Sequence, residues 1–128
     1  MAGQIVRIGN GISGVTCARH IRKNDDQVEI IIVSGETEHF FSRTALMYIY
    51  MGHMKYEHTK PYADDFWSKN RITLKFGWVN QVDFANRHLN FDNGEKLAYD
   101  KLILATGSKP NYFGWPGQDL KGVQGLYS

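Results

Sequence analysis

Three glycines near the start of the chain have a spacing that suits the binding of a phosphate group. Gly9, Gly11 and Gly14 form a Gly-x-Gly-x-x-Gly pattern, with Ile12 and Ser13 between the last two. Glycine allows a tight turn and lets an anion approach the backbone N–H groups, because no side chain stands in the way. A helix beginning at this turn would add its free N–H groups and the positive end of its dipole. The pattern therefore predicts a phosphate-binding turn, with all five residues as binding positions.

The three glycines are expected to have different roles. Gly9 permits the tight turn, and Gly11 leaves the room that a side chain would take from the phosphates. Gly14 lets the following helix pack closely against the strand before it. Of the three, Gly11 is therefore predicted to be the least replaceable for binding.

The segments on either side of the glycines supply the context that this pattern requires. Residues 4–8 form a short apolar run, and residues 15–23 have a helical pattern that ends in basic residues. Residues 28–33 form a nearly continuous β-branched run, which is typical of a parallel strand buried on both faces. Residues from about 4 to 36 are therefore predicted to form a β-α-β unit, in which such glycines bind the pyrophosphate of a dinucleotide.

The end of the second strand is where an acidic residue would hydrogen-bond the ribose of the adenosine half. Gly35 stands about where this acid is expected, and Glu36 follows it. Glu36 is therefore the candidate for the ribose contact, with a solvated loop carboxylate as the alternative. The glycine pattern alone does not separate FAD from NAD or NADP.

Residues 42–69 are predicted to be mainly helical. Ser42 to Met54 has a helical pattern with Ser42 as its N-cap, and Pro61 to Lys69 suits a second short helix. The aromatic residues and methionines of residues 40–56 recur at helical spacing. We interpret them as core, with a surface that faces a quinone or a partner protein as the alternative.

The remaining residues change to short β-rich runs. Residues 72–99 are predicted to form a small antiparallel β-meander, because Asp92 to Glu95 is a strong hairpin-turn signal. Residues 101–106 are predicted to form a further buried strand. Residues 107–128 are rich in Gly and Pro and are predicted to form an irregular tail. The whole chain, 1–128, is predicted to be one α/β domain.

The segment from Tyr99 to Pro110 distinguishes between the dinucleotides. It contains a hydrophobic run typical of a strand, followed by Ala105, Thr106 and Gly107, and then by Pro110. Together with the opening glycines, it resembles the FAD-dependent pyridine nucleotide-disulfide oxidoreductase superfamily over nearly the whole chain. The resemblance implies a Rossmann-like FAD/NAD(P)-binding fold with FAD as the cofactor.

The resemblance also implies roles for particular residues. Ala105, Thr106 and Gly107 would approach the flavin dinucleotide. Asp100 would steady the turn before this strand, and Val79 would offer its backbone to the adenine.

Within the superfamily, two segments resemble different members. Residues 35–39 followed by Arg43 resemble nitrite-reductase-type and ferredoxin-reductase-type flavoproteins, whereas residues 111–117 resemble type II NADH dehydrogenases. Arg43 would face the flavin or the pyrophosphate, where its planar donors match phosphate oxygens, with a surface arginine as the alternative. Residues 40–43 hold no cysteine where other members carry one or two, and Cys17 lies on the first predicted helix. Electrons are therefore expected to pass to an acceptor other than a disulfide of the protein.

Composition and charge limit the other classes of function. The 128 residues are 42% hydrophobic, which suits one globular domain. The net charge is +2 and the basic residues are scattered, so no nucleic-acid surface is expected. The five histidines show no zinc-like spacing, and no apolar run approaches the roughly 20 residues of a transmembrane helix. The lone Cys17 and the lack of a signal-peptide pattern favour the cytoplasm.

These features predict the N-terminal part of an FAD-dependent NAD(P)H oxidoreductase. The resemblance implies that a second glycine pattern for NAD(P)H and a later segment completing the flavin site lie beyond this chain, so no catalytic residue is assigned. The isolated chain is expected to be inactive and to associate as a homodimer or larger assembly, because missing segments would leave apolar surface uncovered. The alternative is a non-catalytic Rossmann module that binds a dinucleotide. The electron acceptor and the choice between NADH and NADPH stay open.

Overall fold

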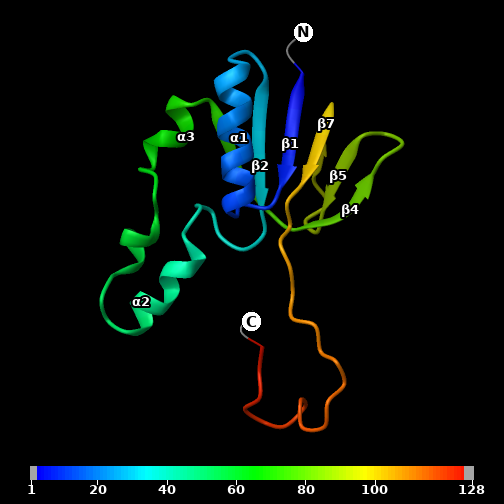
Figure 1. Ribbon diagram of the computed structural model, residues 1–128. Helices are drawn as coiled ribbons and strands as arrows, with labels where there is room; N and C mark the ends of the chain where they lie inside the picture. The colour runs from blue at the N-terminus through cyan, green and yellow to red at the C-terminus, as the bar shows by residue number, and fades with distance from the viewer. Residues whose placement is uncertain (1–2, 126–128) are drawn as a thin grey trace.

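A parallel four-stranded sheet lies at the centre of the computed structural model, which describes residues 3–125 (Figure 1). Its strands run in the order β3-β2-β1-β7. All three pairs of neighbouring strands are parallel. The strands are β1 (Gln4–Ile8), β2 (Glu29–Ser34), β3 (Ile72–Phe76) and β7 (Lys101–Leu104).

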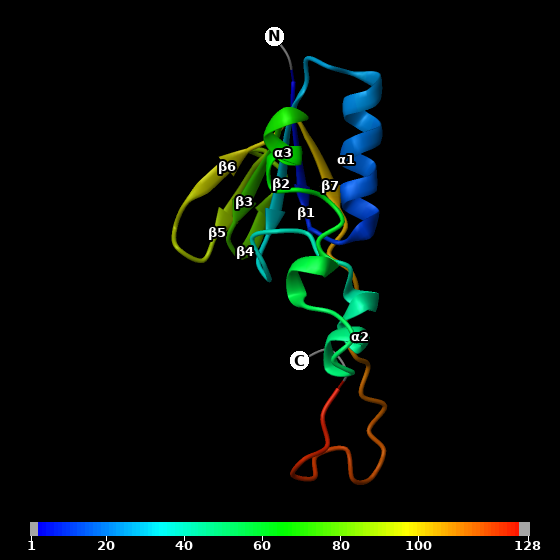
Figure 2. The same cartoon turned by 90° about the vertical axis from the view of Figure 1, so that its left-hand side faces the viewer.

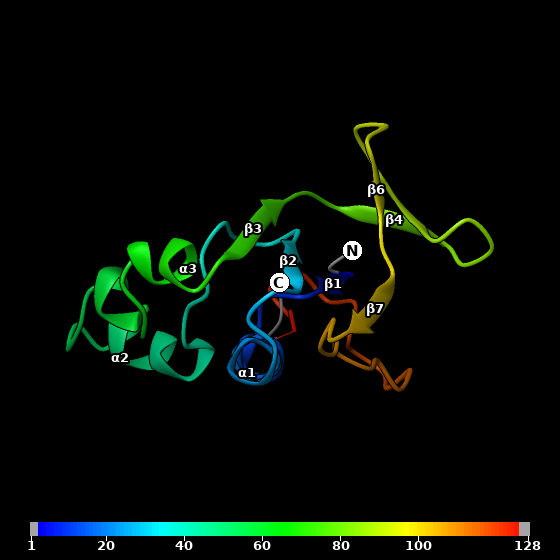
Figure 3. The same cartoon turned by 90° about the horizontal axis from the view of Figure 1, so that it is seen from above.

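Helix α1 (Ile12–Asn24) covers one face of this sheet, and a small second sheet covers the other (Figure 3). The second sheet is antiparallel and has the order β4-β5-β6, with β4 (Val79–Asp83), β5 (His88–Phe91) and β6 (Lys96–Ala98). Two separate hydrophobic cores result. Val15 and Ala18 of α1 pack on Ile30 and Ile32, whereas Val6 packs with Leu89 and Phe91 on the opposite face, among others. The predicted α/β class, with a parallel sheet and a small antiparallel sheet, is confirmed.

The turn between α1 and β2 is held by one carboxylate. Asp25 accepts hydrogen bonds from the backbone N–H groups of Gln27 at 2.9 Å and Val28 at 3.0 Å. These two bonds lower the pKa of the Asp25 carboxyl, because they favour its charged form, and the bond from Gln27 has the larger effect.

The antiparallel meander is shorter than the predicted 72–99. Ile72–Phe76 pairs in parallel with β2 and so belongs to the main sheet. The chain passes between the sheets at Gly77 and Trp78: the Gly77 N–H donates to the Ser34 carbonyl, and the Trp78 carbonyl accepts from the Asp92 N–H. β-rich composition marks both segments as strands but does not select the sheet that each joins. The hairpin turn predicted at 92–95 is present, with Gly94 at a φ of +84°.

The predicted helical segment 42–69 is broken into short pieces (Figure 2). They are the 3₁₀ helices η1 (Arg43–Ala45) and η2 (Tyr56–Thr59) and the α-helices α2 (Leu46–Tyr50) and α3 (Asp65–Lys69). The prediction of one helix from Ser42 to Met54 is therefore wrong. Gly52 adopts a φ of +76° just after α2, which a continuing α-helix cannot accommodate.

The interpretation of residues 40–56 as core is wrong for most of that stretch. Phe40 is buried, but Met47 is 58% exposed and Tyr50 is 93% exposed. The reason is visible in Figure 1, where α2 lies away from the sheet instead of packing on it. Residues 107–125 are irregular and leave the sheet below β7 (Figure 1), and the last three residues of the predicted tail lie outside the described residues. No helix within residues 3–125 is long and apolar enough to cross a membrane.

Candidate dinucleotide-binding site

The ends of three parallel strands meet at Gly9. The Gly9 N–H donates to the carbonyl of Val33 in β2 at 2.8 Å, and the Ala105 N–H donates to the carbonyl of Ile8 at 2.9 Å. Parallel strands bring their carboxyl ends to one edge of a sheet, where α/β proteins bind their ligands. The glycine turn, the loop that holds Glu36 and the segment starting at Ala105 therefore share this edge.

Gly9 stands where the backbone cannot carry a side chain. Its φ is +109°, and a Cβ atom would lie 2.1 Å from the carbonyl oxygen of Ala105. The position thus requires glycine for two reasons, the conformation of the turn and the close approach of the chain that leaves β7. Only the first of these could be expected from the sequence.

Gly11 marks the N-terminus of α1 and faces open space. Its φ of −84° suits any residue, and its carbonyl accepts the N–H groups of Gly14 and Val15. Apart from its two chain neighbours, no atom of residues 3–125 lies within 4 Å of the place that a Cβ would take. Ile12 and Ser13 are exposed beside it, and the first turn of α1 contains no acidic residue. The helix N-terminus therefore presents unshielded N–H groups to this space.

Gly14 is buried against the side chain of Arg7. A Cβ at Gly14 would lie 1.0 Å from Nη2 and 1.3 Å from Cζ of that arginine. The helix starts close to β1 as the pattern predicts, but the close neighbour is a guanidinium group.

Arg7 is the functional candidate that sequence reasoning missed. Its side chain is fully buried, with 1% exposure, and its Nη2 donates to the carbonyl of Gly9. Burial lowers the pKa of Arg7 to about 10, an effect partly opposed by Cys17, so the group stays charged at neutral pH. Within residues 3–125 its Nε and Nη1 have no hydrogen-bond partner, and neither do the buried amide atoms of Asn10 in the same turn. A charged residue within an apolar strand was the signal available in the sequence.

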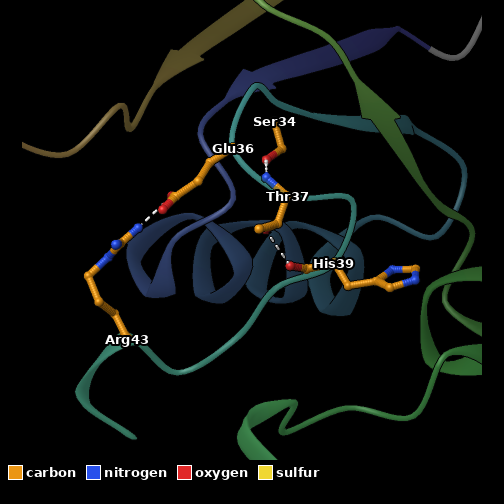
Figure 4. A network of polar contacts seen from close by, with 5 residues as sticks. All are labelled: Ser34, Glu36, Thr37, His39 and Arg43. Atoms are coloured by element: carbon orange, nitrogen blue, oxygen red, sulfur yellow. Dashed lines mark hydrogen bonds and ion pairs between the residues drawn. The ribbon is translucent and has the colours of Figure 1, made fainter. Parts of the chain in front are cut away.

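Glu36 and Arg43, predicted as separate contacts, form an ion pair with 2.5 Å between Oε2 and Nη2 (Figure 4). The two side chains are 59% and 39% exposed, so the pair contributes at most about 1 kcal/mol to stability. The loop that carries Glu36 is held by Thr37, whose N–H donates to the Ser34 hydroxyl and whose hydroxyl donates to the His39 carbonyl.

A side chain at position 35 would meet the side chain of Trp78. A Cβ at Gly35 would lie 2.5 Å from the indole of Trp78, so no carboxylate side chain fits there unless the indole moves. Trp78 itself is 63% exposed, and Val79 follows it at the start of β4. The Gly77 N–H donates to the Ser34 carbonyl at 2.8 Å, which ties this segment to the end of β2. Val79 is therefore near the same edge as Glu36.

Thr106 and Gly107 are exposed where the chain leaves β7, and Gly107 has a φ of +77°. Asp100, at the other end of β7, accepts the Gln4 N–H at 2.6 Å and so joins β7 to β1. Within residues 3–125 no group of three or more His, Cys, Asp or Glu residues could hold a metal ion. A hollow of about 260 Å³ beside Arg22 and Glu29 lies at the opposite edge of the sheet and has no part in this site.

Comparison with known proteins identifies a family for this architecture. The model of the pyridine nucleotide-disulphide oxidoreductase family matches residues 3–127. The chain is 35% identical over 125 residues to the assimilatory nitrate reductase electron transfer subunit of Bacillus subtilis. It is 30% identical over 127 residues to the biphenyl dioxygenase system ferredoxin–NAD(+) reductase component of Paraburkholderia xenovorans.

A solved structure with the same fold is the reductase in the covalent putidaredoxin reductase–putidaredoxin complex. The TM-score is 0.79 at 25% identity, and the match covers 89% of this chain and 28% of that one. The two curated relatives are matched over 96% and 98% of this chain, which spans 16% and 31% of their lengths. The family indicated by the sequence motifs is confirmed, and the chain belongs to the pyridine nucleotide-disulphide oxidoreductases.

Proposed function

We propose that residues 1–128 hold the ADP half of FAD in an NAD(P)H-dependent flavoprotein reductase. The observation that carries this proposal is the meeting of three strand ends at Gly9, next to an open space over Gly11. The pyrophosphate would bind the backbone N–H groups of Gly11, Ile12 and Ser13 above Gly14, and Glu36 would bind the ribose through the carboxylate oxygen not paired with Arg43. Val79 would offer its backbone to the adenine.

The flavin side of the site would involve Ala105, Thr106 and Gly107, which leave β7 beside the glycine turn. Arg43 would bring positive charge to the flavin or the pyrophosphate. Two features of this structure fit an anionic dinucleotide: the space over Gly11, and the buried polar atoms of Arg7 and Asn10, which have no hydrogen-bond partner among the described residues. Bound FAD would supply the redox chemistry, accepting a hydride from NAD(P)H and passing electrons on.

The acceptor that we propose is not a disulfide of the protein. No cysteine lies in residues 40–43, and Cys17 is half-buried in α1, on the face of the sheet that also holds Arg7. The relatives' names, which include a ferredoxin–NAD(+) reductase component, support a separate electron-carrier protein as acceptor. As part of the same proposal, the protein acts in the cytoplasm, where a lone cysteine stays reduced.

The test uses the natural full-length protein. Its absorption spectrum should show bound flavin, and anaerobic addition of NADH or NADPH should bleach it. A ferredoxin should then reoxidise the flavin, whereas a low-molecular-weight disulfide should not. Binding of NADH at the glycine turn without any flavin would refute the proposal and favour the non-catalytic Rossmann module.

A further inference from the structure

Arg7 is a buried cation for which the described part of the chain offers no counter-ion. The side chain is 1% exposed, and in the part of the chain that the structure describes only its Nη2 has a hydrogen-bond partner, the carbonyl of Gly9. None of the ion pairs within residues 3–125 includes it. Burying an unpaired charge is costly, so its position requires an explanation.

The guanidinium group lies directly behind the glycine turn. It occupies the place that a Cβ of Gly14 would take and holds the Gly9 carbonyl, so it is enclosed between the end of β1 and the first turn of α1. The other unpartnered buried group in this turn is the amide of Asn10. The unsatisfied hydrogen-bond donors of the turn are therefore gathered at the helix N-terminus.

The charge of Arg7 is unfavourable there in the absence of a ligand. The N-terminus of a helix carries a partial positive charge, which repels a cation and attracts an anion. An anion on the outer side of the turn would be attracted by both the helix and the guanidinium, across a low-dielectric region where charges interact strongly. The bond from Nη2 also keeps the Gly9 carbonyl directed inward, where its oxygen cannot repel a phosphate.

We propose that Arg7 is the buried counter-charge of the dinucleotide's pyrophosphate and positions the turn that binds it. This inference rests on the proposed function, because it assumes a dinucleotide at the turn. Arg7 acts from behind the backbone, so it raises the affinity for the diphosphate group specifically and leaves the affinity for the nucleoside unchanged. It is a positioning residue and does not touch the ligand.

The test compares a diphosphate with a nucleoside in the natural full-length protein after removal of any flavin. ADP and adenosine compete with FAD during reconstitution, so that only binding at the FAD site is measured. Arg7→Met removes the charge and keeps much of the volume, and Arg7→Lys keeps the charge. We expect the preference for ADP over adenosine to fall about tenfold in Arg7→Met and to fall less in Arg7→Lys. Without ligand, Arg7→Met should melt no lower than the wild type, because an unpaired buried charge has been removed.

The outcomes separate this inference from the proposed function. If the wild type binds neither FAD nor ADP, the proposed function fails. If the wild type binds both but Arg7→Met keeps the full preference for ADP, only the inference is overturned. If Arg7 had a purely structural role, Arg7→Met would lose the same affinity for ADP as for adenosine, and this result would overturn the inference. An Arg7→Met protein that is unfolded without ligand would also contradict the role of a counter-charge.

Discussion

Alanine substitutions at Gly9 and Gly11 should separate folding from binding. At Gly11 a methyl group would meet no atom of residues 3–125 within 4 Å apart from its chain neighbours, and the φ of −84° suits alanine. Alanine is a poorer N-cap than glycine by up to about 1 kcal/mol. The reduced entropy of the unfolded chain returns about 0.4–1 kcal/mol. The free energy of unfolding should therefore change by less than about 1 kcal/mol.

Gly9→Ala should be much more damaging to the fold. Its φ of +109° would strain an alanine by about 1–3 kcal/mol. The new Cβ would also lie 2.1 Å from the carbonyl oxygen of Ala105, and such overpacking costs about a further 1–3 kcal/mol. A total loss of about 2–6 kcal/mol is comparable to the whole stability of many domains.

In contrast to its stability, the FAD affinity of Gly11→Ala should fall strongly. Gly11→Ala places a methyl group where the pyrophosphate must approach, so FAD affinity should fall at least about 100-fold, or about 2.7 kcal/mol. Urea denaturation followed by circular dichroism gives the stabilities, and titration calorimetry of the flavin-free full-length protein gives the affinities. Unchanged FAD affinity in Gly11→Ala would refute the placement of phosphate on this turn. A Gly9→Ala protein as stable as the wild type would refute the steric argument.

Four further outcomes are expected. Gly14→Ala should lower the free energy of unfolding by about 1–3 kcal/mol, because the new methyl group meets the Arg7 side chain. In a protein that also carries Arg7→Val the loss should be clearly smaller. A double-mutant cycle in which Gly14→Ala costs the same in both proteins would contradict the contact between Arg7 and Gly14. Asp25→Ala should destabilise the protein more at pH 7 than at acid pH, because stability from a lowered carboxyl pKa is lost as the pH falls through that pKa. Denaturation curves over a series of pH values test this, and an equal loss at every pH would contradict it. Glu36→Gln should weaken FAD binding in calorimetry while changing stability by less than about 1 kcal/mol, and unaltered affinity would remove its ribose role. Residues 1–128 alone should hold FAD poorly, fail to oxidise NADH and self-associate in light scattering; a monomeric yellow protein that turns over NADH would contradict the proposal of a partial site.

The parts of the structure that could be predicted from the sequence depend on local chemistry. The glycine turn between β1 and α1 could be predicted because closely spaced glycines favour a tight turn at a helix N-terminus. The hairpin at 92–95 could be predicted because its residues accept a positive φ. The buried strand β2 follows from its unbroken β-branched run. In each case the signal lies within a few neighbouring residues, so no knowledge of distant contacts is required.

Contacts between segments far apart in the sequence were decided only by the tertiary structure. Residues 72–76 have the composition of a strand, but their pairing with β2 depends on which edge of the sheet is free. Residues 40–56 repeat apolar side chains at helical spacing, yet α2 finds no surface of residues 3–125 that buries them. A side chain at position 35 would meet the indole of Trp78, and the chain leaving β7 requires glycine at position 9. These are steric facts about neighbours in space, which residue types and spacing along the chain do not encode.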